Sequence, residues 1–276
     1  MHSNRPILPL LASLSLLPGL AQAGAVLFIH PTLVMFEGND RSATITLTNR
    51  GDETGTFEMS FTDMVMTPEG GLVRYEGDTP PWSVQSYVRY SPRRVTLEPL
   101  QSQVVRIAVR RGVDVPEGEY YSHFRVLTLN SEDPLAAERT EEATEQSASA
   151  VVISARSAVA IPVIWRNSRE PASASIEAVH VDNDSNKVNV DVRRLGQLSV
   201  RGYLHVFDTG ADGARMELAE PVPLVIYPNL DTRTMSITLH EDVLAANLPR
   251  NAQVFYSPDL EMSDRSVIID SHPIKP

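Results

Sequence analysis

The chain has 276 residues, a formal net charge of −11 and no cysteine. The lack of cysteine excludes disulfides, thiol catalysis and cysteine metal sites, so each domain has to be stabilised by its own apolar core. The acidic balance argues against binding to nucleic acid or to an anionic membrane surface, although it also suits a protein that is simply soluble.

The first 23 residues have the layout of a secretory signal peptide. A basic start at Arg5 is followed by an apolar run from Ile7 to Leu17 and by the small-x-small ending Ala21-Gln22-Ala23. We expect cleavage after Ala23 and export of the rest. No later segment offers about 18 uninterrupted apolar residues, so we expect no membrane insertion of the mature chain.

The first half of the mature chain alternates apolar and polar residues with a period of two, which predicts β-strands. Clear runs occupy 42–49, 56–66, 102–111 and 119–130, with turn signals such as "NRGDETG", "TPEGG" and "DVPEGE" between them. We find no convincing helical period. Short strands at this spacing indicate an antiparallel sandwich.

After Arg166 a polar segment, "NSREPASAS", has the composition of a linker. Strand patterns resume at 175–183, 187–194, 201–208, 235–239 and 253–271, and "DTGADG" predicts a hairpin turn between Phe207 and Met216. The predicted fold class is all-β, with two tandem sandwiches. The predicted domains are 24–166 and 167–276, the second beginning with the linker.

A long run, Ser149–Arg166, contains no acidic residue and directly follows an acidic tract at 131–148. Alternate positions of this run form a mostly apolar side: Val151, Ile153, Ala155, Ser157, Val159, Ile161, Val163 and Trp165. It is far longer than the usual strand of five or six residues. The alternative is an ordinary buried strand after a long loop. The acidic tract is either a guard against self-association or a tolerated insertion.

Three segments, 28–57, 90–111 and 116–126, resemble the N-terminal domain of periplasmic pilus (fimbrial) chaperones of the PapD type. The resemblance is specific from Ala25 to Arg166 and only architectural beyond. It implies two immunoglobulin-like domains arranged as a boomerang. It also implies that the last strand of the first domain completes an unfinished pilin-like subunit, which an outer-membrane usher later releases.

The resemblance assigns roles to particular residues. Val151, Ile153, Ala155, Ser157 and Val159 would contact the client strand. Arg166 and Glu119 would join the two domains, with a third partner that the sequence does not identify.

The family's carboxylate anchor, an arginine and a lysine in the cleft, falls on Leu33 and Pro162, neither of which carries a charge. The anchor is therefore lost or replaced. The candidate replacements are Arg156, Arg125, Arg193 and Arg194.

The sequence offers no convergent set of catalytic groups. The histidines are scattered without an H-x-H or H-x3-H pair, and no G-x-S-x-G or phosphate-binding glycine loop is present. "DNDSN" (182–186) lacks the glycine and glutamate of a calcium loop, which favours a polar hairpin turn. We expect no catalytic residue, metal or cofactor, and interpret the chain as a protein other than an enzyme.

Together these patterns predict a periplasmic chaperone that donates a strand to pilin-like secreted subunits before delivery to an usher. The alternative is an accessory or structural protein of a surface assembly that keeps the scaffold without donating a strand. The missing anchor and the small residues Ala155 and Ser157 favour that alternative.

Overall fold

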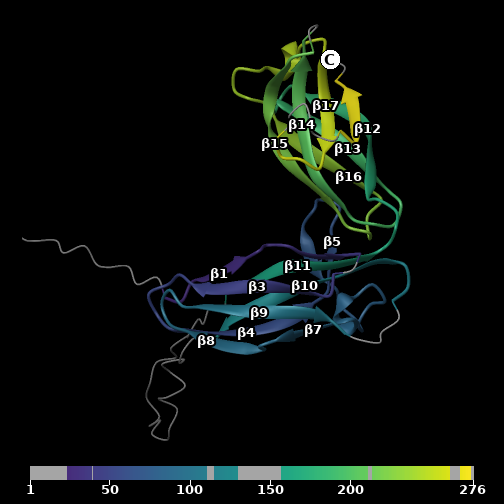
Figure 1. Cartoon of the computed structure of the whole chain (residues 1–276). Helices are drawn as coiled ribbons and strands as arrows, with labels where there is room; N and C mark the ends of the chain where they lie inside the picture. The colour runs from purple at the N-terminus through teal and green to yellow at the C-terminus, as the bar shows by residue number, and fades with distance from the viewer. Residues whose placement is uncertain are drawn as a thin grey trace, which may run out of the picture.

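The computed structural model describes residues 24–38, 40–110, 115–129, 157–210, 213–261 and 268–274. These residues form two β-sandwiches that meet at an angle like the arms of a boomerang (Figure 1). The predicted all-β class is confirmed.

Two sheets face each other in the N-terminal sandwich. The first has the order β1-β3-β9-β7 and comprises Leu27–His30, Ser42–Asn49, Ser102–Val109 and Val88–Ser91. The second has the order β2-β11-β10-β4-β8 and comprises Val34–Glu37, Ala158–Asn167, Gly118–Leu129, Gly55–Thr62 and Arg94–Leu97. A short 3₁₀ helix, η1, spans Val84–Ser86.

The apolar positions that define these strands in the sequence are the ones that fill the core. In β3, Ile45 and Leu47 are fully buried between polar neighbours. Phe57 and Phe124 meet them from the second sheet. Each fully buried side chain of this size contributes about 1.5–3 kcal/mol relative to exposure, which explains why a cysteine-free sandwich is stable.

A small hairpin projects from the N-terminal sandwich towards its partner (Figure 1). Its strands are β5 (Met64–Met66) and β6 (Leu72–Arg74), which pair only with each other in the described chain. The sequence pattern predicts one strand over 56–66. The structure divides it at Asp63, because the Asp63 carboxylate is bound inside the sandwich by Ser83 and Ser122.

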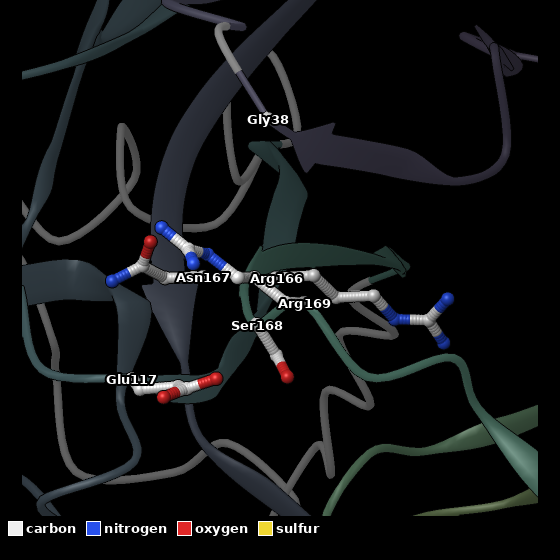
Figure 2. Close-up of a pocket in the computed structure, with 6 residues that line it drawn as sticks. All are labelled: Gly38, Glu117, Arg166, Asn167, Ser168 and Arg169. Atoms are coloured by element: carbon white, nitrogen blue, oxygen red, sulfur yellow. The ribbon is translucent and has the colours of Figure 1, made fainter.

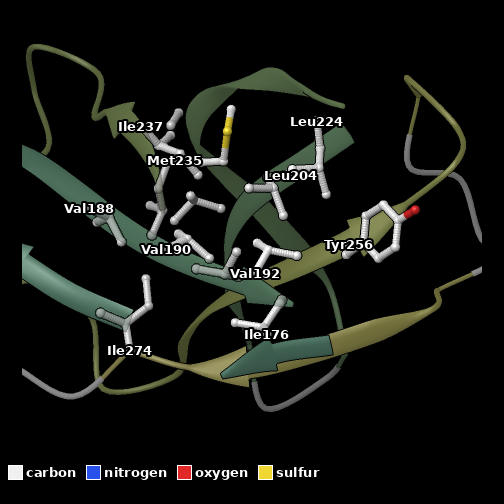
Figure 3. Packing of buried hydrophobic residues seen from close by; sticks show 14 of the residues in the cluster. Ile176, Val188, Val190, Val192, Leu204, Leu224, Met235, Ile237, Tyr256 and Ile274 are labelled. Carbon is white, nitrogen blue, oxygen red and sulfur yellow. The ribbon is translucent and has the colours of Figure 1, made fainter. Parts of the chain in front are cut away.

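The C-terminal sandwich packs a sheet of order β12-β13-β16 against one of order β15-β14-β17-β18. The first comprises Ser173–Asp182, Lys187–Leu195 and Thr232–Thr238. The second comprises Arg215–Ile226, Val200–Thr209, Ala252–Ser257 and Asp270–Pro273, with a 3₁₀ helix, η2, at Ala245–Asn247. Figure 3 shows the core, in which Val188, Val190 and Val192 of β13 face Leu204 of β14.

Candidate functional site: a free strand edge beside the domain junction

Strand β11 has a free outer edge along its first half. On one side it pairs antiparallel with β10, from Ala158 opposite Leu127 to Asn167 opposite Gly118. On the other side β2 runs parallel to it only from Val163 to Arg166. Among the described residues, no strand pairs with the outer side of 158–162. Backbone donors and acceptors there are open to another strand.

The register shows which backbone groups point outward. The Thr128 N–H donates to the Ser157 carbonyl at 2.9 Å. Odd-numbered residues of β11 therefore exchange hydrogen bonds with β10, and the even-numbered Ala158, Ala160 and Pro162 direct theirs to the free edge. Pro162 has no N–H to offer, so it ends the free edge just before β2 begins to pair.

The side chains of β11 divide between the two faces of its sheet. Ile161, Val163 and Trp165 enter the core of the N-terminal sandwich. Val159, on the same side, is 37% exposed, and Ser157 is exposed as well. The remaining residues expected to contact a client lie outside the described part of the chain: Val151, Ile153 and Ala155.

Arg166 and Glu119 connect the two sandwiches at the other end of β11. Glu119 Oε2 accepts hydrogen bonds from Arg166 Nε at 2.9 Å and from the Ser199 N–H at 3.1 Å. Arg166 Nη2 also donates to the Ser199 carbonyl at 2.8 Å. Ser199 directly precedes β14, so the partner that the sequence could not identify is a backbone group of the C-terminal sandwich. Glu37 adds a second carboxylate, 3.2 Å from Arg166 Nη1.

A polar pocket of about 360 Å³ opens beside this ion pair. Figure 2 shows the six residues that line it: Gly38, Glu117, Arg166, Asn167, Ser168 and Arg169. Arg166 and Asn167 extend to one side while Arg169 points away from them. The lining combines one carboxylate with two guanidinium groups, and half of its residues belong to the linker, so we find no convergent set of catalytic groups in it.

An apolar cluster, here called the interdomain cluster, joins the sandwiches next to the free edge. It consists of Met66, Tyr121, Ile164 and Tyr227, with partly buried Leu33, Met35, Trp82, Val225 and Leu230. Tyr227, Val225 and Leu230 come from the C-terminal sandwich. Leu33 stands where the family resemblance places an arginine, and it packs against this apolar cluster instead.

A histidine, a tyrosine and an arginine form a chain of polar contacts at the border of the interdomain cluster. Tyr227 Oη is 3.2 Å from His123 Nε2 and 3.2 Å from Arg201 Nη2. His123 is 1% exposed. Burial and the nearby Arg201 charge lower its pKa to about 4, so it is neutral at pH 7.

Two side-chain nitrogen atoms of these residues make no hydrogen bond within the described part of the chain. His123 Nδ1 and Arg201 Nε are buried and have no hydrogen-bond partner among the described residues. His123 also lies opposite Pro162 in the β10–β11 register. Arg201 is therefore linked through Tyr227 to His123, and His123 is the cross-strand neighbour of Pro162, the position at which the resemblance places a lysine.

The four candidate replacement arginines occupy different settings. Arg125 is partly buried on β10, opposite Ala160. Arg193 is half exposed and paired with Glu177 at 2.5 Å. Arg194 donates to the carbonyls of Leu230, Pro228 and Gly196, so its guanidinium holds the turn that follows β15. Arg156 lies outside the described residues.

Sequence reasoning missed Ile164, His123 and Arg201. In the run Ser149–Arg166, Ile164 lies on the side opposite the mostly apolar one, where most residues are small or polar. It is nevertheless fully buried in the interdomain cluster. Arg201 precedes Gly202 in an ordinary strand pattern. A Cβ at Gly202 would lie 2.5 Å from the Ser257 carbonyl oxygen, so only a glycine allows the two strands to approach this closely. A glycine inside a strand pattern was therefore the one sequence feature that could have drawn attention to Arg201.

Two kinds of feature are absent from the described residues. No group of three or more His, Asp or Glu side chains there is arranged to hold a metal ion. Asp182, in "DNDSN", accepts hydrogen bonds from the Ser185 backbone and hydroxyl, as in a polar hairpin turn. No helix in the described residues is long and apolar enough to cross a membrane.

Known proteins that resemble this chain are found among solved structures. No protein-family model matches it, and no curated protein sequence does. One similar structure is the CsuC–CsuE chaperone–tip adhesion subunit pre-assembly complex of the archaic chaperone-usher Csu pili of Acinetobacter baumannii. The match has 12% identity and a TM-score of 0.49, and covers 89% of this chain and 99% of the other.

Two further similar structures are single chaperones. The YadV chaperone is 12% identical with a TM-score of 0.43, covering 90% of this chain and 99% of its own. The Pseudomonas aeruginosa CupB2 chaperone is 15% identical with a TM-score of 0.43, covering 83% and 92%. The chain is similar in structure to PapD-type fimbrial chaperones. All three TM-scores lie below 0.5, so function is argued from the site itself.

Proposed function

We propose that this protein is a periplasmic chaperone that completes unfinished immunoglobulin-like subunits by adding β11 to them as a strand. The observation that carries the proposal is the free edge at 158–162, where Ala158 and Ala160 direct backbone groups away from β10. A subunit that lacks one strand exposes a row of unpaired backbone groups and core side chains. Strand addition satisfies both defects at once.

The side chains at the free edge suit a strand that is lent and later withdrawn. Ala158 and Ala160 are small and exposed, so a client strand can approach without a clash. Val159 supplies one apolar group that is already partly exposed. We infer that Val151, Ile153, Ala155 and Ser157 extend this contact, and that an outer-membrane usher exchanges the lent strand for the next subunit.

We further propose that Arg201 replaces the missing carboxylate anchor. Its guanidinium is held by Tyr227, lies near His123 and retains an unpartnered Nε among the described residues. A client that ends in a carboxylate beside Pro162 would meet this charge, and charge-assisted hydrogen bonds are roughly twice as strong as neutral ones. This position would set the register of the added strand.

The test is co-expression in a bacterial periplasm with small secreted subunits encoded beside this gene. Ala160→Pro removes an N–H that points to the free edge and leaves the bonds to β10 in place. We expect this variant to recover at least tenfold less client, while its thermal unfolding stays close to that of the wild-type chain.

Ala108→Pro, in β9 of the opposite sheet, is the matched control for introducing proline into a strand outside the free edge. It is expected to affect folding and client recovery together, whereas Ala160→Pro affects recovery alone. Full client recovery by a folded Ala160→Pro chain would contradict strand donation. Incorporation of the protein into isolated surface filaments would support the non-donating structural role, which the apolar Leu33 favours.

A further inference from the structure

The β5–β6 hairpin is fixed at its root by a buried carboxylate. Asp63, directly before β5, accepts hydrogen bonds from Ser122 Oγ at 2.6 Å, Ser83 Oγ at 2.9 Å and Gln85 Nε2 at 2.8 Å. Its backbone carbonyl also accepts from the Tyr75 N–H, directly after β6. Both ends of the hairpin are thereby attached to the N-terminal sandwich.

An asparagine side chain of the C-terminal sandwich makes two hydrogen bonds to the hairpin. Asn229 Oδ1 accepts from the Met66 N–H at 3.2 Å, and Asn229 Nδ2 donates to the Met66 carbonyl at 2.8 Å. The side-chain amide thus pairs with the outer edge of β5 much as a residue of a neighbouring strand would. Asn229 sits in the turn after β15, closed by the Leu230 N–H on the Tyr227 carbonyl and held by Arg194.

Two further contacts surround this amide pair. The Met66 side chain is buried in the interdomain cluster against Tyr227. At the hairpin turn, Gly70 has a φ of +87°, and a Cβ there would overlap the Arg233 guanidinium. Only glycine therefore combines this backbone conformation with the close approach of Arg233. Root, edge and tip of the hairpin are each fitted to a particular partner.

We propose that the β5–β6 hairpin is an interdomain latch that sets the angle between the two sandwiches. It shares no residue with the Arg166–Glu119 pair, so it attaches the two sandwiches at a point separate from that pair and from the linker. A single linker leaves two domains free to reorient, whereas attachment at separate points holds them in one arrangement. The proposal does not depend on the chaperone role.

The test compares Asn229→Asp with the full wild-type chain. Aspartate keeps the shape and still accepts from the Met66 N–H, but it cannot donate to the Met66 carbonyl. We expect amide hydrogen exchange at residues 64–74 to become about tenfold faster, as the loss of one hydrogen bond and the repulsion of two oxygens predict. Exchange in β13 and β14 should not change.

A second readout measures the angle itself. Because the chain has no cysteine, spin labels can be placed specifically by Glu98→Cys and Glu241→Cys, at one exposed position in each sandwich. We expect one narrow distance distribution in the labelled wild-type chain and a broader one with Asn229→Asp. Asn189→Asp is the matched control, because the Asn189 side chain accepts a hydrogen bond from the Ser236 hydroxyl on β13 and donates to no group among the described residues.

The outcomes separate the latch from a general loss of stability. Faster exchange confined to 64–74, together with a broader distance distribution, supports the latch. Unchanged exchange and distances would overturn it, and so would faster exchange spread over both sandwiches. A broad distribution in the wild-type chain would also overturn it, since the angle would then not be set.

Discussion

Glu119 and Arg166 are direct cross-strand neighbours on β10 and β11, and the glutamate side chain is fully buried while the arginine is 16% exposed. The pair is completed by the backbone of Ser199 in the second sandwich. An ion pair inside one sheet therefore becomes a junction between domains. Its Glu119 Oε1 has no partner among the described residues, so Arg166 supplies most of the compensation for this buried charge.

Removal of Arg166 should be costly. Arg166→Ala leaves Glu119 buried without its counter-charge, and breaking such a pair costs about 3–5 kcal/mol. We expect the free energy of unfolding in urea to fall by roughly 3 kcal/mol. Arg94→Ala is the control, because the exposed Arg94–Glu58 pair should contribute about 1 kcal/mol or less. An equal decrease in the free energy of unfolding in the two variants would show that the Arg166–Glu119 pair contributes no more than an exposed surface ion pair.

His123 should make the chain less stable in mild acid. Its pKa is lowered from the ordinary 6.5 of a histidine to about 4 in the folded protein, first by burial and then by the Arg201 charge. Between these values the unfolded chain binds the proton and the folded chain does not, so stability falls as pH decreases from about 6.5 to about 4. His123→Gln should reduce this loss by about 1–2 kcal/mol between pH 7 and pH 4.5.

The measurement is urea unfolding at several pH values in that window. His30→Gln, at an exposed position on β1, is the control and should keep the wild-type pH dependence. A wild-type slope in His123→Gln would mean that other groups dominate the acid response.

An arginine at position 33, where the family resemblance places one, should destabilise this protein. Leu33 packs against the interdomain cluster, and a charge placed there is partly desolvated without a carboxylate partner. We expect Leu33→Arg to lower the free energy of unfolding by about 1–3 kcal/mol. Leu244→Arg, at a side chain that is 57% exposed, should be near neutral. Tighter client binding by a stable Leu33→Arg chain would argue that the cleft still accepts the family's anchor.

Arg201 should act on the client's terminal carboxylate specifically. For a peptide that carries the last strand of a client subunit, we expect Arg201→Gln to weaken binding about tenfold. The same peptide ending in an amide should bind the wild-type chain and the variant equally. Arg193→Gln is the control, since Arg193 is paired with Glu177 on the surface. Equal weakening for both peptide forms would assign Arg201 a purely structural role.

Much of the fold follows from local patterns. The alternation in 42–49 coincides with β3, and the polar hairpin turn at "DNDSN" joins β12 to β13. Alternation is a property of neighbouring residues, so it determines which faces are apolar before any packing occurs. Alternation could not predict that the run 56–66 is divided into two strands. The division at Asp63 depends on hydrogen bonds from Ser83 and Ser122, which lie far along the chain.

The sequence by itself determined an all-β chain, two successive groups of strands and an apolar side on the last strand of the first group, of which the structure describes Ala158–Asn167. Only the tertiary structure decided what surrounds that strand. Arg201 and His123 come from different sandwiches and face each other through Tyr227, while Leu33 joins Ile164 in the interdomain cluster. The spacing of residues predicts which face of a single strand is apolar. It does not predict which faces of the two domains pack against each other, and that packing forms the junction.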